Sequence, residues 1–117
     1  MPLGIDFRKH LREAVIRCDI LLAVIGQHWL EFTAESGRRR LDDPTDYLRI
    51  EMEAALERDI PLIPVFVQGA TMPSIDLLPS TLSLLVYRHG IHVRTDPDFH
   101  GDVDRLIRGI EQHFKGR

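Results

Sequence analysis

The sequence has one cysteine, no glycine-rich phosphate loop and no long hydrophobic run, and each absence excludes a class of protein. Cys18 alone cannot form an internal disulfide, and the chain has no cysteine pair of the kind that binds a metal. The longest apolar run, residues 20–25, is far too short to cross a bilayer, and the amino-terminus shows no signal-peptide pattern. We therefore expect a cytoplasmic protein that does not enter a membrane.

Neither sign of charge dominates the composition. Fifteen Lys and Arg residues against 18 Asp and Glu residues give a formal net charge of -3, so bulk charge does not indicate a nucleic-acid partner. The chain is 44% hydrophobic and 28% charged, which is ordinary for a folded protein. At 117 residues it can build one core, and we expect a single domain spanning residues 1–117.

Several common catalytic arrangements are missing as well. There is neither a dinucleotide-binding fingerprint nor a P-loop, and no serine lies in a nucleophile-elbow context. His89 and His92 have no third ligand at a recognisable spacing, so we expect no metal site. Glu51 is left as the residue whose position suggests chemistry.

Hydrophobic periodicity predicts alternating helices and strands. Helical spacing covers residues 6–18, 43–59, a shorter piece from 79 to 90, and 98–114, while apolar runs at 20–25, 61–67 and 91–94 predict strands. This order is typical of a parallel α/β sheet with right-handed crossovers. The run at 20–25 is apolar at every position, which predicts an interior strand covered on both faces. Pro64 removes a ladder donor, so we expect it at a bulge or an irregular pairing.

The central helix carries the acidic candidate. Asp43 fits the N-cap and Pro44 the first helical position. Glu51 falls between the apolar face and a water-facing set formed by Arg49, Glu53 and Glu57. Tyr47, four positions earlier, projects beside Glu51. By spacing alone, Glu51 is either a pocket carboxylate or, as is commoner on helices, a half-exposed surface one.

Three other features have two interpretations each. Trp29 follows the first strand at its carboxyl end, where it can contact a ligand or serve as packing. Arg8 and Lys9 oppose the dipole of the first helix and face either an anionic ligand or, more commonly, solvent. The run Arg38–Arg40 attracts phosphates or, as we favour, forms a solvated loop.

Four segments together resemble a bacterial Toll/interleukin-1 receptor (TIR) domain, and the match covers nearly the whole chain. They are residues 2–7 (PLGIDF), 18–29 (CDILLAVIGQHW), 39–51 (RRLDDPTDYLRIE) and 63–67 (IPVFV). The resemblance implies a flavodoxin-like parallel sheet in the strand order B-A-C-D-E with helices on both faces. Many bacterial and plant members of this family cleave the nicotinamide glycosidic bond of NAD+, while others assemble with further TIR domains in signalling.

The resemblance also implies roles for individual residues. Glu51 falls on the catalytic glutamate that ends the family's W-x-x-x-E motif, in which Tyr47 here replaces the tryptophan. Gly4 lies in the segment that resembles the end of the BB loop, which gates the pocket. With NAD+ as substrate and no further cofactor, Tyr47, Trp29, Gly4 and Phe7 are the implied binding residues.

A family member carries roughly 40 residues ahead of the segment matching Pro2, with strand A, helix A and strand B. We therefore expect a sheet truncated to about three strands (C, D and E) with four helices, and weak or absent NAD+ cleavage by this short form. Without strands A and B the run at 20–25 has an unpaired edge, and the face formed by Phe7, Leu11 and Val15 lacks part of its cover. We expect a homo-oligomer, most simply a two-fold pair.

Overall fold

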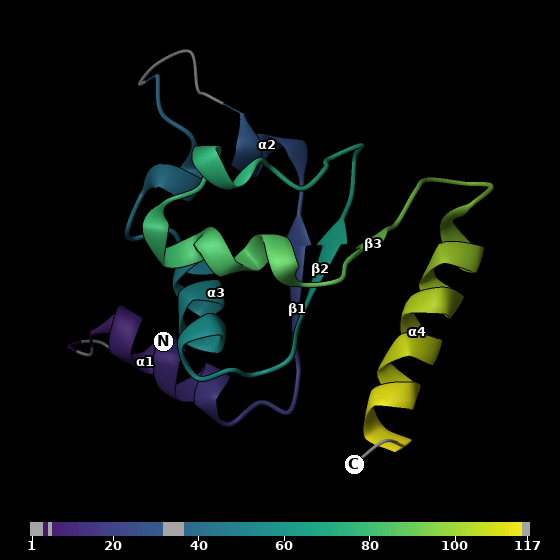
Figure 1. The fold of residues 1–117 in the computed structure, drawn as a ribbon, viewed down its shortest axis with the longest axis horizontal. Helices are drawn as coiled ribbons and strands as arrows, with labels where there is room; N and C mark the ends of the chain where they lie inside the picture. The colour runs from purple at the N-terminus through teal and green to yellow at the C-terminus, as the bar shows by residue number, and fades with distance from the viewer. Residues whose placement is uncertain (1–3, 5, 32–36, 116–117) are drawn as a thin grey trace.

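The computed structural model describes residues 4, 6–31 and 37–115, with helices on both sides of a small sheet (Figure 1). The α-helices are α1 (Phe7–Ile16), α2 (Gln27–Leu30), α3 (Tyr47–Glu57) and α4 (Phe99–Lys115). The strands are β1 (Leu21–Ile25), β2 (Leu62–Phe66) and β3 (Ile91–His92), and three 3-10 helices are η1 (Arg40–Asp42), η2 (Ile75–Leu77) and η3 (Ser80–Tyr87). Within the described residues this confirms the predicted α/β class and its three strands. Three of the four predicted helices are the α-helices α1, α3 and α4, whereas the predicted piece from 79 to 90 is the 3-10 helix η3, and α2 was not predicted.

All three strands are parallel, in the order β1-β2-β3. The register of β1 on β2 runs without a break from Leu21↔Leu62 to Ile25↔Phe66. The shorter β3 pairs only with the last two residues of β2, beginning at Val65↔Ile91. This order is the one expected for strands C, D and E.

One face of the sheet carries the core. Successive side chains of a strand point to opposite faces, so Ala23, Ile25, Leu62 and Phe66 share one side. They are buried against side chains of α1, α3 and η3, among them Val15, Met52, Ala55, Leu82 and Leu85. In Figure 1 these three helices lie together on one side of the strands. The helix α3 lies between the sheet and α1 and supplies the largest share of the core.

The opposite face is covered only in part. Ile63 and Ile91 line a cavity with Leu106 of α4, which lies beyond β3 in Figure 1. Leu22 and Val24 of β1 point to this same face and remain 40% and 56% exposed. The prediction that residues 20–25 form an interior strand covered on both faces was therefore wrong. Among the described residues β1 is an edge strand, and α4 covers only the far end of the sheet.

The face of α1 is better covered than the sequence suggested. Asp6 caps this helix as predicted, its carboxylate accepting a hydrogen bond from the Arg8 backbone nitrogen at 3.0 Å. Val15 is 2% exposed in the core beside α3 residues, and Leu11 and Phe7 are half-buried. Because α3 packs against α1, the expected apolar patch on this helix is largely covered.

The start of α3 differs from the predicted one. Its N-cap is Asp46, whose carboxylate accepts from the Arg49 backbone nitrogen at 3.0 Å. Asp43 instead accepts from the backbone and hydroxyl of Thr45, at 2.9 and 2.7 Å, and so closes a local turn. The predicted cap at Asp43 with Pro44 inside the helix was wrong because this turn uses the Asp43 carboxylate before the helix begins.

Pro64 lies neither at a bulge nor at an irregular pairing, contrary to the prediction, because the register with β1 runs unbroken through Ala23↔Pro64. In a parallel sheet, alternate residues of a central strand bond to alternate neighbours. Val67 donates to Ile25 of β1, while Phe66 accepts from Val93 on the β3 side. Pro64 has the parity of Phe66, so its nitrogen faces the β3 side below the point where that pairing begins. The missing N–H therefore costs no ladder bond to β1.

Gly90 allows the chain to pass close to β2 before β3 begins. A Cβ atom at position 90 would lie 2.7 Å from the Pro64 carbonyl oxygen and 2.9 Å from the Phe66 ring. We expect Gly90→Ala to lower the free energy of unfolding by about 1–3 kcal/mol, because backbone must shift to make room. Gly101→Ala, at an open helical position of α4, should be neutral or slightly stabilising. Urea denaturation of both variants measures this difference, and equal stabilities would contradict it.

Candidate functional site

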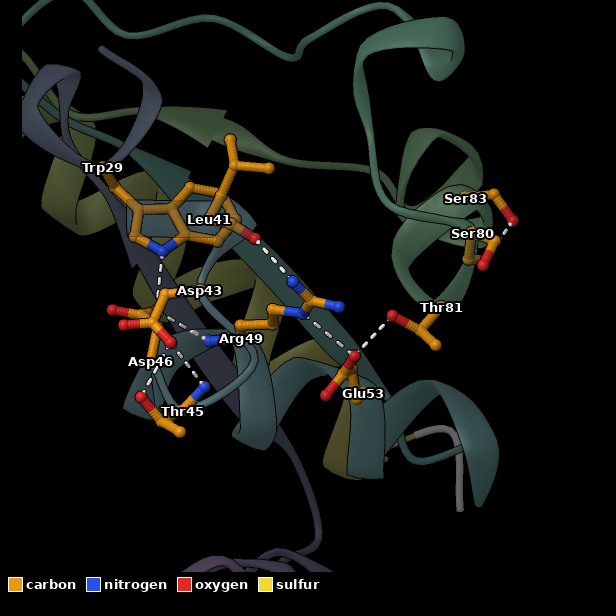
Figure 2. A network of polar contacts seen from close by, with 10 residues as sticks. All are labelled: Trp29, Leu41, Asp43, Thr45, Asp46, Arg49, Glu53, Ser80, Thr81 and Ser83. Atoms are coloured by element: carbon orange, nitrogen blue, oxygen red, sulfur yellow. Dashed lines mark hydrogen bonds and ion pairs between the residues drawn. The ribbon is translucent and has the colours of Figure 1, made fainter. Parts of the chain in front are cut away.

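Asp46 holds the start of α3 against the segment that follows β1 (Figure 2). Trp29 of α2 is 3% exposed, and its indole Nε1 donates to Asp46 Oδ2 at 2.8 Å. Arg40 adds an ion pair to the other carboxylate oxygen at 3.2 Å. With the helix-capping bond, three groups satisfy a carboxylate that is 8% exposed. The start of α3 is thereby fixed at the carboxyl end of β1, the edge where open α/β sheets bind ligands.

A second set of contacts continues along α3 to η3. Arg49 donates to Glu53 at 3.1 Å and to the Leu41 carbonyl at 3.2 Å, and Glu53 accepts from the Thr81 hydroxyl (Figure 2). The Arg49 and Glu53 side chains are only 13% and 15% exposed. The prediction that both face water was therefore wrong. They connect α3 to η1 and η3 on the flank of the helix, while exposed Glu57 does face water.

Glu51 lies one turn beyond the start of α3 and is half-buried. No hydrogen bond or ion pair joins its carboxylate to any residue that the structure describes. Burial raises the pKa of Glu51 above its ordinary value, and the negative charge of Asp46 raises it further. Contact with a positively charged group would stabilise the ionised form of such a carboxylate.

Two aromatic rings pack together at the start of α3, one turn before Glu51. The ring centroids of Phe7 and Tyr47 are 5.2 Å apart and the planes are tilted by 33°. Tyr47 is 52% exposed and, four residues before Glu51, shares its side of the helix. We define Phe7, Tyr47 and Glu51 as the candidate site. An aromatic surface beside a carboxylate suits a flat ring that carries positive charge.

The other two predicted binding residues lie differently. Gly4 is exposed, with a φ of 78° in the left-handed region that favours glycine, while Pro2 and Leu3 lie outside the described residues. Trp29 is in the core and has little surface left with which to touch a ligand. Its burial agrees with the packing interpretation, and its hydrogen bond to Asp46 is a role that was not predicted.

The arginine run is tied into the fold. Arg39 donates to both oxygens of Asp42 at 3.0 Å and to the Leu77 carbonyl at 2.6 Å. Arg40 pairs with Asp46. At least two of the three guanidinium groups therefore brace the connection before α3, which neither the phosphate interpretation nor the solvated-loop interpretation anticipated.

Asp102 is a buried acid in α4 that was not among the predicted site residues. Asp102 is 0% exposed and accepts from the backbone, Nε and Nη2 of Arg94 at 2.8, 2.9 and 3.0 Å, with Arg105 as a further partner. These hydrogen bonds hold the Asp102 pKa far below its ordinary value. The available signal was its place on the apolar stripe of the helix, three residues after Phe99 and four before Leu106.

Across residues 4, 6–31 and 37–115, no group of three or more His, Cys, Asp or Glu side chains could hold a metal ion. The helices in that part of the chain also lack the length and apolar character needed to cross a membrane.

No protein-family model matches the sequence, and no curated protein is significantly similar to it.

Proposed function

We propose that this chain is part of a cytoplasmic TIR domain whose complete form hydrolyses NAD+. The observation that carries the proposal is Glu51, a half-buried carboxylate with a raised pKa, one helical turn after Tyr47, whose ring packs on Phe7. Its position in α3 agrees with that of the family's catalytic glutamate. The strand order β1-β2-β3 agrees with the last three strands of the family's sheet.

In the proposed reaction the bond between the nicotinamide nitrogen and C1′ of its ribose breaks, and positive charge moves from the ring to the sugar. The Glu51 carboxylate stabilises the oxocarbenium-like charge at C1′, and the Phe7–Tyr47 surface stacks against the flat nicotinamide. Water then adds to C1′ and releases a proton, so the products are nicotinamide and ADP-ribose. Glu51 must be ionised, and activity should fall as the pH drops through its raised pKa.

The test is nicotinamide release from NAD+ by this chain and by a form that adds a strand A, helix A and strand B segment ahead of Pro2. We expect weak turnover by the short form and clear turnover by the extended one. Glu51→Ala should lower the rate of the extended form by about 100-fold or more, since it removes charge stabilisation at the reacting carbon.

Glu57→Ala is the matched control, because Glu57 is an exposed glutamate on the same helix. Its rate should equal that of the parent. An inert extended form, or a Glu51→Ala variant that keeps the parental rate, would refute the proposal.

A second candidate function is assembly with other copies or other TIR domains, and the edge of β1 favours it. Leu21 donates to Pro61 and Ile25 accepts from Val67, so the odd-numbered residues bond to β2. Leu22 and Val24 consequently direct their backbone groups to the open edge, and their side chains are exposed. Such an edge recruits another strand.

A two-fold antiparallel pair centred on Ala23 would set Leu22 opposite Val24 of the second copy and extend the sheet to six strands. We expect sedimentation equilibrium to show a dimer that Leu22→Lys dissociates. Tyr87→Lys, at a 74% exposed position on η3, should not affect it. A monomer at high micromolar concentration, with Leu22→Lys changing nothing, would remove this candidate.

A further inference from the structure

A cavity of about 240 Å³ lies between α4 and the sheet, on the face opposite the core. It is separate from the candidate site on α1 and α3. The residues that line it come from β2, from the turn before β3, from β3 and from α4: Ile63, His89, Gly90, Ile91, Arg105, Leu106 and Gly109. Its volume is slightly below the usual range for drug-sized ligands, which indicates a smaller occupant.

The floor and one wall of this cavity are apolar. Ile91 pairs beside Val65, so Ile91 and Ile63 point to the same face of the sheet, and Leu106 faces them from α4. Gly109 keeps the space open, since a Cβ atom there would meet nothing within 4 Å. A larger side chain at position 109 would project into the gap that a ligand could use.

The polar groups of the cavity are cationic or hydrogen-bond donors. Arg105 is held by Asp102, and its side chain is 52% exposed. A guanidinium has five N–H donors, so Arg105 can bind Asp102 and a second acceptor together. His89 adds an imidazole from the turn before β3. None of the described residues that line the cavity is acidic.

We propose that this cavity binds a small organic monoanion with an apolar body, of the size of benzoate. The apolar body would lie on Ile63, Ile91 and Leu106, and the carboxylate would accept hydrogen bonds from Arg105 and His89. The positive charge of Arg105 favours an anionic ligand, and the open space beside Gly109 limits the size of that ligand. This binding is independent of NAD+ cleavage.

The test is an amide chemical-shift titration of the whole chain with benzoate, with benzyl alcohol as the uncharged probe of similar shape. We expect saturable shifts in residues 89–91 and 105–109, and at least tenfold weaker binding of benzyl alcohol. Arg105→Gln should weaken benzoate binding about tenfold, as expected for a lost hydrogen bond to a charged group. Arg108→Gln, at an exposed arginine outside the cavity lining, should leave it unchanged.

Gly109→Leu tests the cavity with Arg105 and its partner Asp102 both retained. It should abolish benzoate binding, whereas Gly101→Leu, at an equally open position of the same helix, should not. Thermal unfolding of both leucine variants shows whether α4 stays folded. The proposal would be overturned if the two probes bound equally, if benzoate shifts did not saturate, or if saturable shifts appeared elsewhere. The same effect from both leucine variants would also overturn it.

Discussion

Asp102→Asn is expected to lower the melting temperature by more than about 10 °C. The substitution leaves the Arg94 and Arg105 guanidinium groups facing a neutral amide with fewer acceptor sites at a position that is 0% exposed. It also weakens the contact that holds α4 to the connection after β3. Asp104→Asn, at an exposed position on the same helix, is the matched control and should change little.

The same carboxylate predicts how stability depends on pH. Its pKa is lower in the folded protein than in the unfolded chain, so its contribution is fully present above the ordinary value near 3.8. That contribution is lost as the pH falls below this value toward the depressed pKa. Thermal unfolding of the parent should therefore show a steep loss of stability below about pH 4, and Asp102→Asn should flatten this dependence. Parallel curves for parent and variant would contradict the assignment.

Asp46→Ala is expected to lower the free energy of unfolding by about 2–4 kcal/mol, from the lost helix cap and the unpaired indole N–H of Trp29. Asp43→Ala is the informative comparison, because Asp43 closes an exposed turn and does not cap α3. We expect it to cost less than about 1 kcal/mol. Urea denaturation of both variants decides between the two caps, and a larger loss from Asp43→Ala would contradict the account.

Asp46→Ala should also change the pKa of Glu51. Removing the negative charge at position 46 should move the Glu51 pKa down toward its ordinary value, with the part caused by burial remaining. A carbon-13 titration of the Glu51 carboxyl group measures this shift. An unchanged pKa would mean that Asp46 does not influence the candidate site.

Local patterns predicted most of the elements because each carried its own signal. The apolar run of residues 20–25, the cap at Asp6 and the amphipathic pattern of 98–114 depend on neighbours in the sequence, and the corresponding β1, α1 and α4 are present. The errors arose where a distant contact decided the outcome. The covering of Leu22 and Val24 depends on where α4 lies over the sheet, which no pattern within β1 records.

In the candidate site, too, the local relation was predicted and the contact between distant residues was not. The proximity of Tyr47 and Glu51 follows from helical spacing and was predicted. The role of Asp46 was not, because it depends on Trp29, 17 residues earlier, folding back from the end of β1. The local rule placed the cap at Asp43, since a proline after an acid is a strong start signal. Two contacts distinguish the two acids: the turn that Asp43 closes with Thr45, and the tertiary hydrogen bond from Trp29 to Asp46.

A nuclear magnetic resonance titration with NAD+ tests the proposed binding at Phe7, Tyr47 and Glu51 without requiring turnover. We predict saturable shifts in the Phe7 and Tyr47 rings and in the Glu51 carboxyl carbon. We also predict a fall in the Glu51 pKa as the positively charged nicotinamide ring approaches. ADP-ribose lacks that ring and should leave the Glu51 pKa near its value in the free protein. Saturating NAD+ that leaves these three residues unshifted, or that shifts them without lowering the Glu51 pKa, would contradict the account.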